Sequence, residues 1–300
     1  MMDWVTLAIL STATLGVVNI FDSHLISKRM PSFRVYLLLV GAVMLTYGLV
    51  LFFLFPLPPD ISPRILLVAI GQGFGRILGV ILMLYVFRTE EVSRAVPVVY
   101  AYPIFVALMS APLLGESLSL LEWLAVFIVV AGAVIVSIRR SLSGAIALGK
   151  PFLLLVGSAL LFAVTDVASK YVLSQLSFLS LFWLSAFCMA VVSFTISVRP
   201  DTFRQLGEMR RKRPAIGLLI FAESISVVGI ILSLWAIQLG PVALVSTINA
   251  SRPIFVVFFA LVLSRTSPMF LEFAPGKGLL ALRLVASAMI VSGIAIIYLT

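Results

Sequence analysis

The tetrapeptide Pro103-Ile104-Phe105-Val106 occurs twice in this chain, because positions 253–256 also read Pro-Ile-Phe-Val. At the same offset of 150 positions Gly79 falls on Gly229, and the two stretches align without a gap over about forty residues, a length typical of an internal repeat. Both copies lie in long apolar runs, with the proline near the middle of each run. We therefore expect an internal duplication whose two halves share one structure.

The composition is that of a membrane protein. Hydrophobic residues make up 62% of the chain and charged residues only 11%, whereas a soluble globular chain carries about a quarter charged residues. Apolar runs of about twenty residues recur from end to end, each long enough to cross a hydrocarbon core of about 30 Å. The N-terminus lacks a basic segment and a small-residue cleavage site, so its first helix is expected to be retained. The predicted fold class is an all-α polytopic membrane protein.

Ten membrane-spanning helices are predicted from these apolar runs and from the turn residues that separate them. Five spans per copy is an odd number, so the second copy must enter the membrane in the opposite direction from the first. The sequence thus predicts two inverted five-helix repeats, over residues 1–140 and 148–300. The spans are expected at residues 4–25, 35–55, 65–87, 92–114, 120–138, 151–173, 178–198, 215–239, 242–263 and 278–299.

Loop charges predict the orientation. Sixteen of the 21 Lys and Arg residues lie in loops that follow odd-numbered spans, whereas the opposite face has only Arg64 in a loop. Because positive residues concentrate in cytoplasmic loops, the odd loops are expected in the cytoplasm and both termini outside. The predicted location is the inner (plasma) membrane, as a multi-pass protein in contact with the lipid bilayer. The same distribution accounts for the basic net charge without a nucleic-acid partner.

A second repeat marker is proposed in the first span of each half. Asn19-Ile20-Phe21-Asp22 resembles Ala163-Val164-Thr165-Asp166, and each aspartate lies late in its own span. Inversion would place Asp22 toward the cytoplasm and Asp166 toward the exterior. Such mirrored depths suit a site that opens alternately to the two sides.

The repeats resemble the EamA type of the drug/metabolite transporter superfamily. The resemblance rests on the Pro-Ile-Phe in each fourth span, on Leu114-Gly115-Glu116-Ser117-Leu118 and on a fifth span that contains Gly132. It covers nearly the whole chain and implies a ten-helix carrier with a central cavity. The second half departs from the pattern, because Ser264-Arg265 stands where Gly-Glu is expected, so the role of Glu116 is not carried over to it.

Ionisable residues within the spans are candidates for the substrate site. Each costs about 2.5–3.5 kcal/mol at a helix centre, so it implies a partner or a cavity. Arg76 and Arg252 lie near the middle of their spans, and Arg252 directly precedes Pro253, which disrupts the helix. A guanidinium at such a break could bind a carboxylate or phosphate bidentately. The structural alternative is an ion pair with Glu223. The residues concerned are Arg76, Lys170, Arg252, Arg283, Asp22, Asp166 and Glu223.

Glu223 is a candidate for proton coupling. It lies eight residues into its predicted span, about 12 Å deep at 1.5 Å per residue, where a carboxyl could exchange a proton and link export to the proton gradient. The alternative is a fixed salt bridge to Arg76 or Arg252. Asp166 and Lys170 are four positions apart and are expected to pair on one face of their helix.

Polar and aromatic residues at a similar depth complete the predicted pocket. Gln72 shares a helix face with Arg76, beside a small-residue ridge of Gly71, Gly75 and Gly79 that allows close helix packing. Tyr102 occupies the position of Arg252 in the other repeat. For each aromatic, packing or lipid contact is the alternative to ligand contact. The candidate substrate-binding residues are Arg76, Arg252, Gln72, Tyr102, Tyr100, Trp235 and Asn249.

These features favour a secondary transporter that exports a small polar metabolite, with both charge signs suiting an amino-acid-like zwitterion or an organic anion. A lipid-linked carrier or flippase and a multidrug exporter remain alternatives, as does a receptor or scaffold. The lone Cys188 and lone His24 argue against disulfides, cysteine metal clusters and multi-histidine metal sites, and no cofactor is expected. An intramembrane enzyme is not supported, because no Ser/His pairing or His-Asp metal cluster is present.

Overall fold

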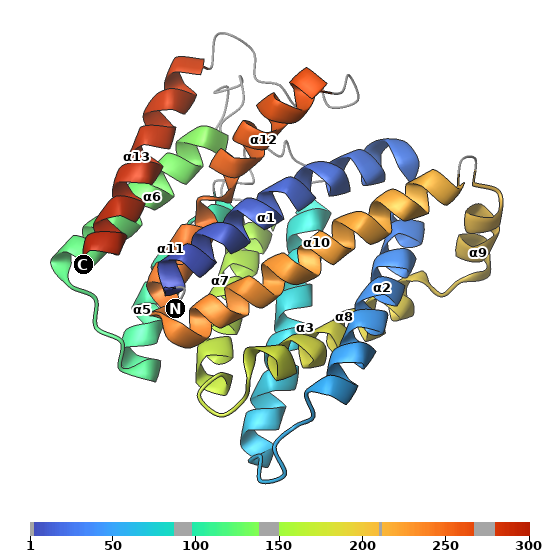
Figure 1. Ribbon diagram of the computed structural model, residues 1–300, viewed down its shortest axis with the longest axis horizontal. Coiled ribbons are helices and arrows are strands. Elements are labelled where there is room, and N and C mark those ends of the chain that lie inside the picture. The colour runs from blue at the N-terminus through green and yellow to red at the C-terminus, as the bar shows by residue number, and fades with distance from the viewer. Residues whose placement is uncertain (1–2, 87–97, 138–149, 210–211, 267–279) are drawn as a thin grey trace.

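The computed structural model describes residues 3–86, 98–137, 150–209, 212–266 and 280–300, and these residues form helices and no strand (Figure 1). Residues 141–147, between the two predicted repeats, and the Arg283 side chain lie outside the described parts. The helices are α1 Trp4–His24, the π-helix η1 Leu25–Arg29, α2 Phe33–Leu54, α3 Pro63–Val86, α5 Tyr102–Leu114, α6 Leu120–Ser137, α7 Lys150–Val172, α8 Phe178–Ser197, α9 Pro200–Gly207, α10 Lys212–Leu239, α11 Val242–Ala250, α12 Arg252–Thr266 and α13 Leu280–Leu299.

Within the described residues, seven helical segments are long and apolar enough to cross a membrane, and three shorter ones are also apolar. Large apolar side chains such as those of Phe53 and Leu67 are 78% and 71% exposed. Exposed apolar surface of this kind suits contact with lipid rather than with water. The seven are Trp4–Arg29, Phe33–Leu54, Pro63–Met83, Lys150–Val172, Phe178–Ser197, Lys212–Leu239 and Val242–Leu263, and the shorter ones are Val98–Leu114, Leu120–Ile135 and Leu284–Leu299.

Each of these segments falls where the sequence predicts a span, so the membrane-protein class is supported and the count of ten spans stays a prediction. Local chemistry sets several helix ends. Asp3 and Ser177 are N-caps, whose side chains accept hydrogen bonds from the backbone of Thr6 and Ser180. Gly115 ends α5 in the left-handed conformation, with φ of 72°, which glycine adopts without a steric penalty.

The helix that contains each Pro-Ile-Phe is broken at the same place in the two halves. In the second half α11 ends at Ala250 and α12 begins at Arg252. In the first half, Ala101 separates the helical residues 98–100 from α5, which has its proline in the first turn. Proline needs no hydrogen-bond acceptor for its nitrogen there, so it starts a helix readily but does not continue one. The predicted disruption next to Arg252 is therefore confirmed.

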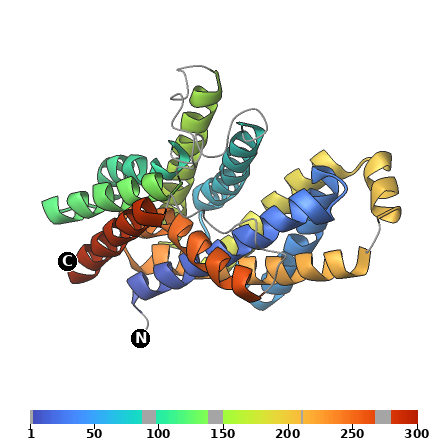
Figure 2. The same cartoon turned by 90° about the horizontal axis from the view of Figure 1, so that it is seen from above.

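Helices of the first half pack against helices of the second half in matching pairs. The helix α1 packs along α10 and α3 packs along α7, while α2 pairs with α8 and α6 pairs with α13. The last pair lies side by side at one edge of the molecule (Figures 1 and 2). In the duplication α1 corresponds to α7, α2 to α8, α3 to α10 and α6 to α13. When each helix is replaced by its counterpart, the pair α1·α10 becomes α7·α3, and the pairs α2·α8 and α6·α13 stay the same, as expected for a duplicated structure.

The α1·α10 and α3·α7 contacts use the same chemistry. Ser158 Oγ donates to the carbonyl oxygen of Gly79 and Ser11 Oγ to that of Gly229, both at 2.8 Å. A Cβ on either glycine would approach a side chain of the facing helix to 3.0 Å or less. Only glycine therefore allows the two helices to pack this closely at these positions. In the predicted small-residue ridge, Gly75 and Gly79 face α7 in this way, whereas Gly71 has no such neighbour.

These hydrogen bonds correct the proposed repeat marker. They match Ser11 with Ser158, which are 147 positions apart. At that offset Asp166 corresponds to Asn19, and Asp22 corresponds to Ser169. The correspondence of Asp22 with Asp166, which assumed an offset of 144, is therefore wrong.

Candidate functional site

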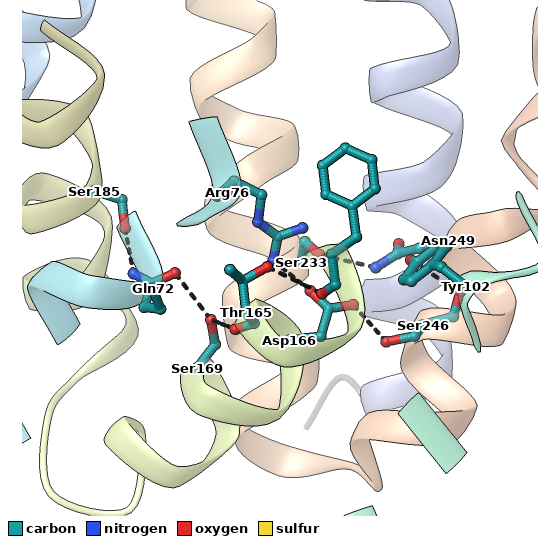
Figure 3. A network of polar contacts seen from close by, with 11 residues as sticks. Gln72, Arg76, Tyr102, Thr165, Asp166, Ser169, Ser185, Ser233, Ser246 and Asn249 are labelled. Atoms are coloured by element: carbon teal, nitrogen blue, oxygen red, sulfur yellow. Dashed lines mark hydrogen bonds and ion pairs between the residues drawn. The ribbon is translucent and has the colours of Figure 1, made fainter. Parts of the chain in front are cut away.

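Arg76 and Asp166 form an ion pair between α3 and α7 (Figure 3). The Asp166 side chain is only 3% exposed, whereas that of Arg76 is 38% exposed. Ser246 on α11 donates its hydroxyl to the second carboxylate oxygen of Asp166 at 2.6 Å. Asp166 is thus fully engaged, while the guanidinium keeps accessible donors. The predicted local pair of Asp166 with Lys170 is wrong.

Tyr102 and Gln72 extend this network to neighbouring helices. The Tyr102 hydroxyl donates from α5 to the carbonyl oxygen of Ser246 at 3.2 Å. The Gln72 amide donates to Ser185 Oγ on α8 at 2.7 Å, and its carbonyl oxygen accepts from Ser169 Oγ on α7 at 3.3 Å (Figure 3). The two candidate residues are 9% and 5% exposed. The Tyr102 hydroxyl thus holds the backbone of Ser246, the residue that donates to Asp166, and Gln72 joins α3 to α7 and α8, so the donors of both side chains are engaged within the protein.

Arg252 forms no ion pair with a carboxylate among the described residues. Its side chain is partly buried at the first residue of α12, and its Nε is shielded from solvent with no hydrogen-bond partner in the described residues. Its electrostatic neighbours are Tyr100 and Tyr102. Neither arginine pairs with Glu223, so the predicted salt-bridge alternative is not formed. Tyr102 is also an electrostatic neighbour of Arg76. This tyrosine therefore lies near both guanidinium groups.

The remaining candidates lie in other surroundings. The Asn249 amide donates to Ser233 Oγ on α10 and accepts from Thr12 Oγ1 on α1, both at 3.0 Å. These bonds join α1, α10 and α11, and Figure 3 shows the contact of Asn249 with Ser233. Trp235 instead stacks on Phe178, with ring centroids 5.2 Å apart and planes at 11°. Stacking accounts for its position through packing alone.

Glu223 lies with a second acid. Its side chain is buried at 4% exposure, and it interacts electrostatically with Asp22 on α1 and with Tyr36 on α2. No basic side chain of the described residues forms an ion pair with either acid. Sequence reasoning placed Glu223 deep in its span but did not find its partner.

A clamp that the sequence did not predict holds the turn between α10 and α11. We call it the Lys170–Glu116 clamp. The Glu116 carboxylate accepts from the backbone nitrogen of Val242, at 3.1 and 3.0 Å from its two oxygens, and lies 4.0 Å from Lys170 Nζ. Cations favour helix C-termini and anions favour N-termini, so each charge meets its preferred end. Lys170 Nζ donates to the carbonyl oxygens of Ile237, Gln238 and Gly240 at 2.9, 3.3 and 2.7 Å.

The arrangement offers two separated polar sites. One contains Arg76, Asp166 and Arg252, and the other contains Asp22 and Glu223. Among the described residues no group of three or more His, Cys, Asp or Glu side chains could hold a metal ion. The first site can bind an anion, because its one buried carboxylate is already neutralised by Arg76.

Comparisons with known proteins agree with this fold. The sequence pattern of the EamA-like transporter family matches the chain twice, over residues 2–138 and 149–299. One solved crystal structure superimposes with a TM-score of 0.69 on 99% of this chain and 95% of its own, at 20% sequence identity, a likeness that concerns the fold alone. None of the curated proteins compared with the chain matches its sequence.

Proposed function

The chain belongs to the EamA-like transporter family of the drug/metabolite transporter superfamily, and from this premise we propose that it is a secondary carrier that exports a small organic anion or zwitterion by alternating access. The carrier consists of two inverted five-helix repeats, residues 1–140 and 148–300, with ten spans in the inner membrane. The matching α1·α10 and α7·α3 contacts support the repeats. The site lies where the broken helices of the two repeats meet α3 and α7, as in other inverted-repeat carriers.

The unpaired guanidinium of Arg252 is the observation on which the cargo class rests. An uncompensated charge inside a membrane protein is costly and marks a functional position. Arg76 adds a second guanidinium with 38% of its side chain accessible, while Asp166 is only 3% exposed. The accessible charge of the site is therefore positive. This balance favours an anionic group on the cargo, such as a carboxylate or phosphate, over an organic cation.

Coupling to protons is assigned to Glu223. Its side chain is buried and has no cationic partner among the described residues. A carboxyl in these surroundings loses solvation when it ionises, so it can take up and release a proton as access alternates. The carrier then exchanges protons for cargo across the membrane.

A ligand screen on the purified protein tests the cargo class. We expect organic anions or amino acids to raise the thermal unfolding midpoint, because a ligand at a hundredfold its Kd stabilises the folded state by about 2.7 kcal/mol. Monocarboxylates, phosphomonoesters, amino acids and quaternary ammonium ions are the probes, and hits are then tested for saturable counterflow in liposomes. Stabilisation by the quaternary ammonium ions alone would indicate a multidrug exporter instead.

The Lys170–Glu116 clamp is expected to control opening on the exterior side, where the proposed orientation places the turn between α10 and α11. Replacing Lys170 by methionine removes three hydrogen bonds to the end of α10. If this shifts the equilibrium toward an exterior-open state by about 1–3 kcal/mol, exterior access rises about 5- to 150-fold. The measurement is the labelling rate of a Ser233→Cys reporter, in a Cys188→Ser background, by a membrane-impermeant maleimide.

Arg64→Gln is the matched control for that measurement, because Arg64 lies at the same end of the molecule but contacts the ring of Tyr171, at 5.9 Å from its centroid, rather than the clamp. Its labelling rate should equal that of the unaltered carrier. Equal rates in the Lys170→Met protein as well would mean that the clamp only stabilises the turn.

A further inference from the structure

Asp22 on α1 and Glu223 on α10 are electrostatic neighbours on two helices that pack along each other. The neighbouring rings of Phe21 and Phe221 are 5.9 Å apart and edge to face, which fixes the two helices in contact at this level. Glu223 is 4% exposed. The Oδ1 atom of Asp22 is shielded from solvent and receives no hydrogen bond. We refer to these two residues as the Asp22–Glu223 pair.

A tyrosine lies near the pair, and no basic side chain of the described residues forms an ion pair with either acid. Tyr36, 7% exposed on α2, lies close enough to interact electrostatically with both acids. The described ion pairs all lie elsewhere. The titratable and charged groups on the helices that carry or contact the pair include Arg34, Tyr36 and Tyr47 on α2, Arg252 on α12, Lys212 and Arg213 on α10, His24 at the end of α1, and Lys28 and Arg29 on η1.

Two ionised carboxylates cannot share such a position without strong repulsion. In a low-dielectric interior, like charges at close range favour a state in which one group is protonated. The unpartnered Oδ1 atom of Asp22 also lacks the donor that a buried oxygen requires. A single proton between the two carboxyls removes the repulsion and supplies that donor.

We propose that the Asp22–Glu223 pair is a proton-binding site that holds one shared proton, with Tyr36 donating its hydroxyl to Asp22. A metal cation does not fit as well, because such ions take about six or more oxygen ligands and the described residues here offer two carboxyls and one phenol. Loss of the proton leaves two neighbouring negative charges on α1 and α10. Their repulsion separates these helices at this end, and this opening step is how the pair drives transport.

The site itself does not depend on the cargo, whereas its role in coupling rests on the proposed function. The test therefore begins without cargo, with the thermal unfolding midpoint of the purified protein measured from mildly acidic to mildly alkaline pH. The folded state binds one proton more than the unfolded chain, in which both carboxyls are solvated and ionised. The slope of the free energy of unfolding against pH is proportional to the number of protons bound by the unfolded state minus the number bound by the folded state. This difference is negative here, so stability must fall as pH rises.

We expect Asp22→Asn and Glu223→Gln each to reduce this fall, and the effect of the double variant to differ from the sum of the two, because the proton is shared. Asp201→Asn, on the exposed surface of α9, should keep the full pH dependence. In parallel, the infrared band of a protonated carboxyl should be present in the unaltered protein, shifted in each single variant and absent from the double variant. An unchanged pH dependence in the single variants, or additive losses in the double variant, overturns the shared-proton site.

Two further arms separate this inference from the proposed function. Replacing choline by Na⁺ should leave the midpoint unchanged, and a Na⁺-dependent rise that the variants lose would reassign the pair to a metal cation. In liposomes, Glu223→Gln should uncouple transport from pH but leave counterflow intact. Absence of counterflow from the unaltered protein with every anion and amino acid tested would contradict the carrier proposal and leave the proton site standing.

Discussion

Replacing Arg252 by alanine is expected to abolish concentrative transport while the protein still inserts and folds. Arg252 forms no ion pair among the described residues, so its removal breaks no structural salt bridge. What it removes is the proposed charged donor for the cargo, and hydrogen bonds to charged groups contribute about 1.5–3 kcal/mol each. We therefore expect the apparent affinity in liposome counterflow to fall at least tenfold, since each 1.4 kcal/mol is a factor of ten.

Two companion variants make this result specific. Arg252→Lys keeps the charge but not the planar pair of donors, so it should retain part of the affinity and lose selectivity for carboxylates and phosphates. Arg204→Gln is the control for a lost positive charge, because that side chain is 69% exposed on α9. Full affinity in Arg252→Ala would remove this residue from the substrate site and with it the reason for an anionic cargo.

The features that sequence could predict are those that depend on short stretches of chain. Apolar runs give the spans, and a proline in the middle of a run gives the break that separates α11 from α12. The position of Arg252 beside this break follows from adjacency alone. An intramembrane charge was also a sound signal that Arg76 needs a partner.

The identity of that partner could not be predicted, because Arg76 and Asp166 are 90 positions apart in the sequence and meet only when α3 packs on α7. Helix periodicity assigned Asp166 to Lys170, four residues away. Lys170 instead reaches three carbonyl oxygens at the end of α10. A local rule describes an isolated helix and does not include the unpaired carbonyls of its neighbours.

The register of the first helix of each half was missed for a related reason. The match of Asp22 with Asp166 was chosen because they are two charged residues in otherwise apolar sequence, and charge does not fix which residues of two helices are equivalent. The packed glycines Gly79 and Gly229 select a different register, because the carbonyl oxygen of each accepts a hydrogen bond from a serine, Ser158 or Ser11, on the facing helix. The two equivalent interfaces therefore differ in charge. The α3·α7 interface carries the ion pair of Arg76 with Asp166, whereas the α1·α10 interface carries the two acids Asp22 and Glu223. The short helix α9 was missed because eight residues are too few to show a helical period.

The ion pair of Arg76 with Asp166 should respond unequally to loss of its two members. Arg76→Gln leaves a carboxylate that is 3% exposed without its cation, and breaking a buried pair in this way costs about 3–5 kcal/mol. Asp166→Asn leaves a guanidinium that is 38% exposed, so it can be solvated and the loss should be smaller. The measurement is the thermal unfolding midpoint and the folded yield of each variant.

The double variant Arg76→Gln/Asp166→Asn decides between a structural and a functional pair. Neutral amides can hydrogen bond to each other and to Ser246, so the double variant should be more stable than Arg76→Gln alone, with a coupling energy of about 0.5–3 kcal/mol between the two sites. Its transport should nevertheless stay lost, because both the exposed guanidinium and the carboxylate that orients it are gone. Recovery of transport together with stability would show that the pair serves only to join α3 to α7, and that Arg252 binds the cargo without it.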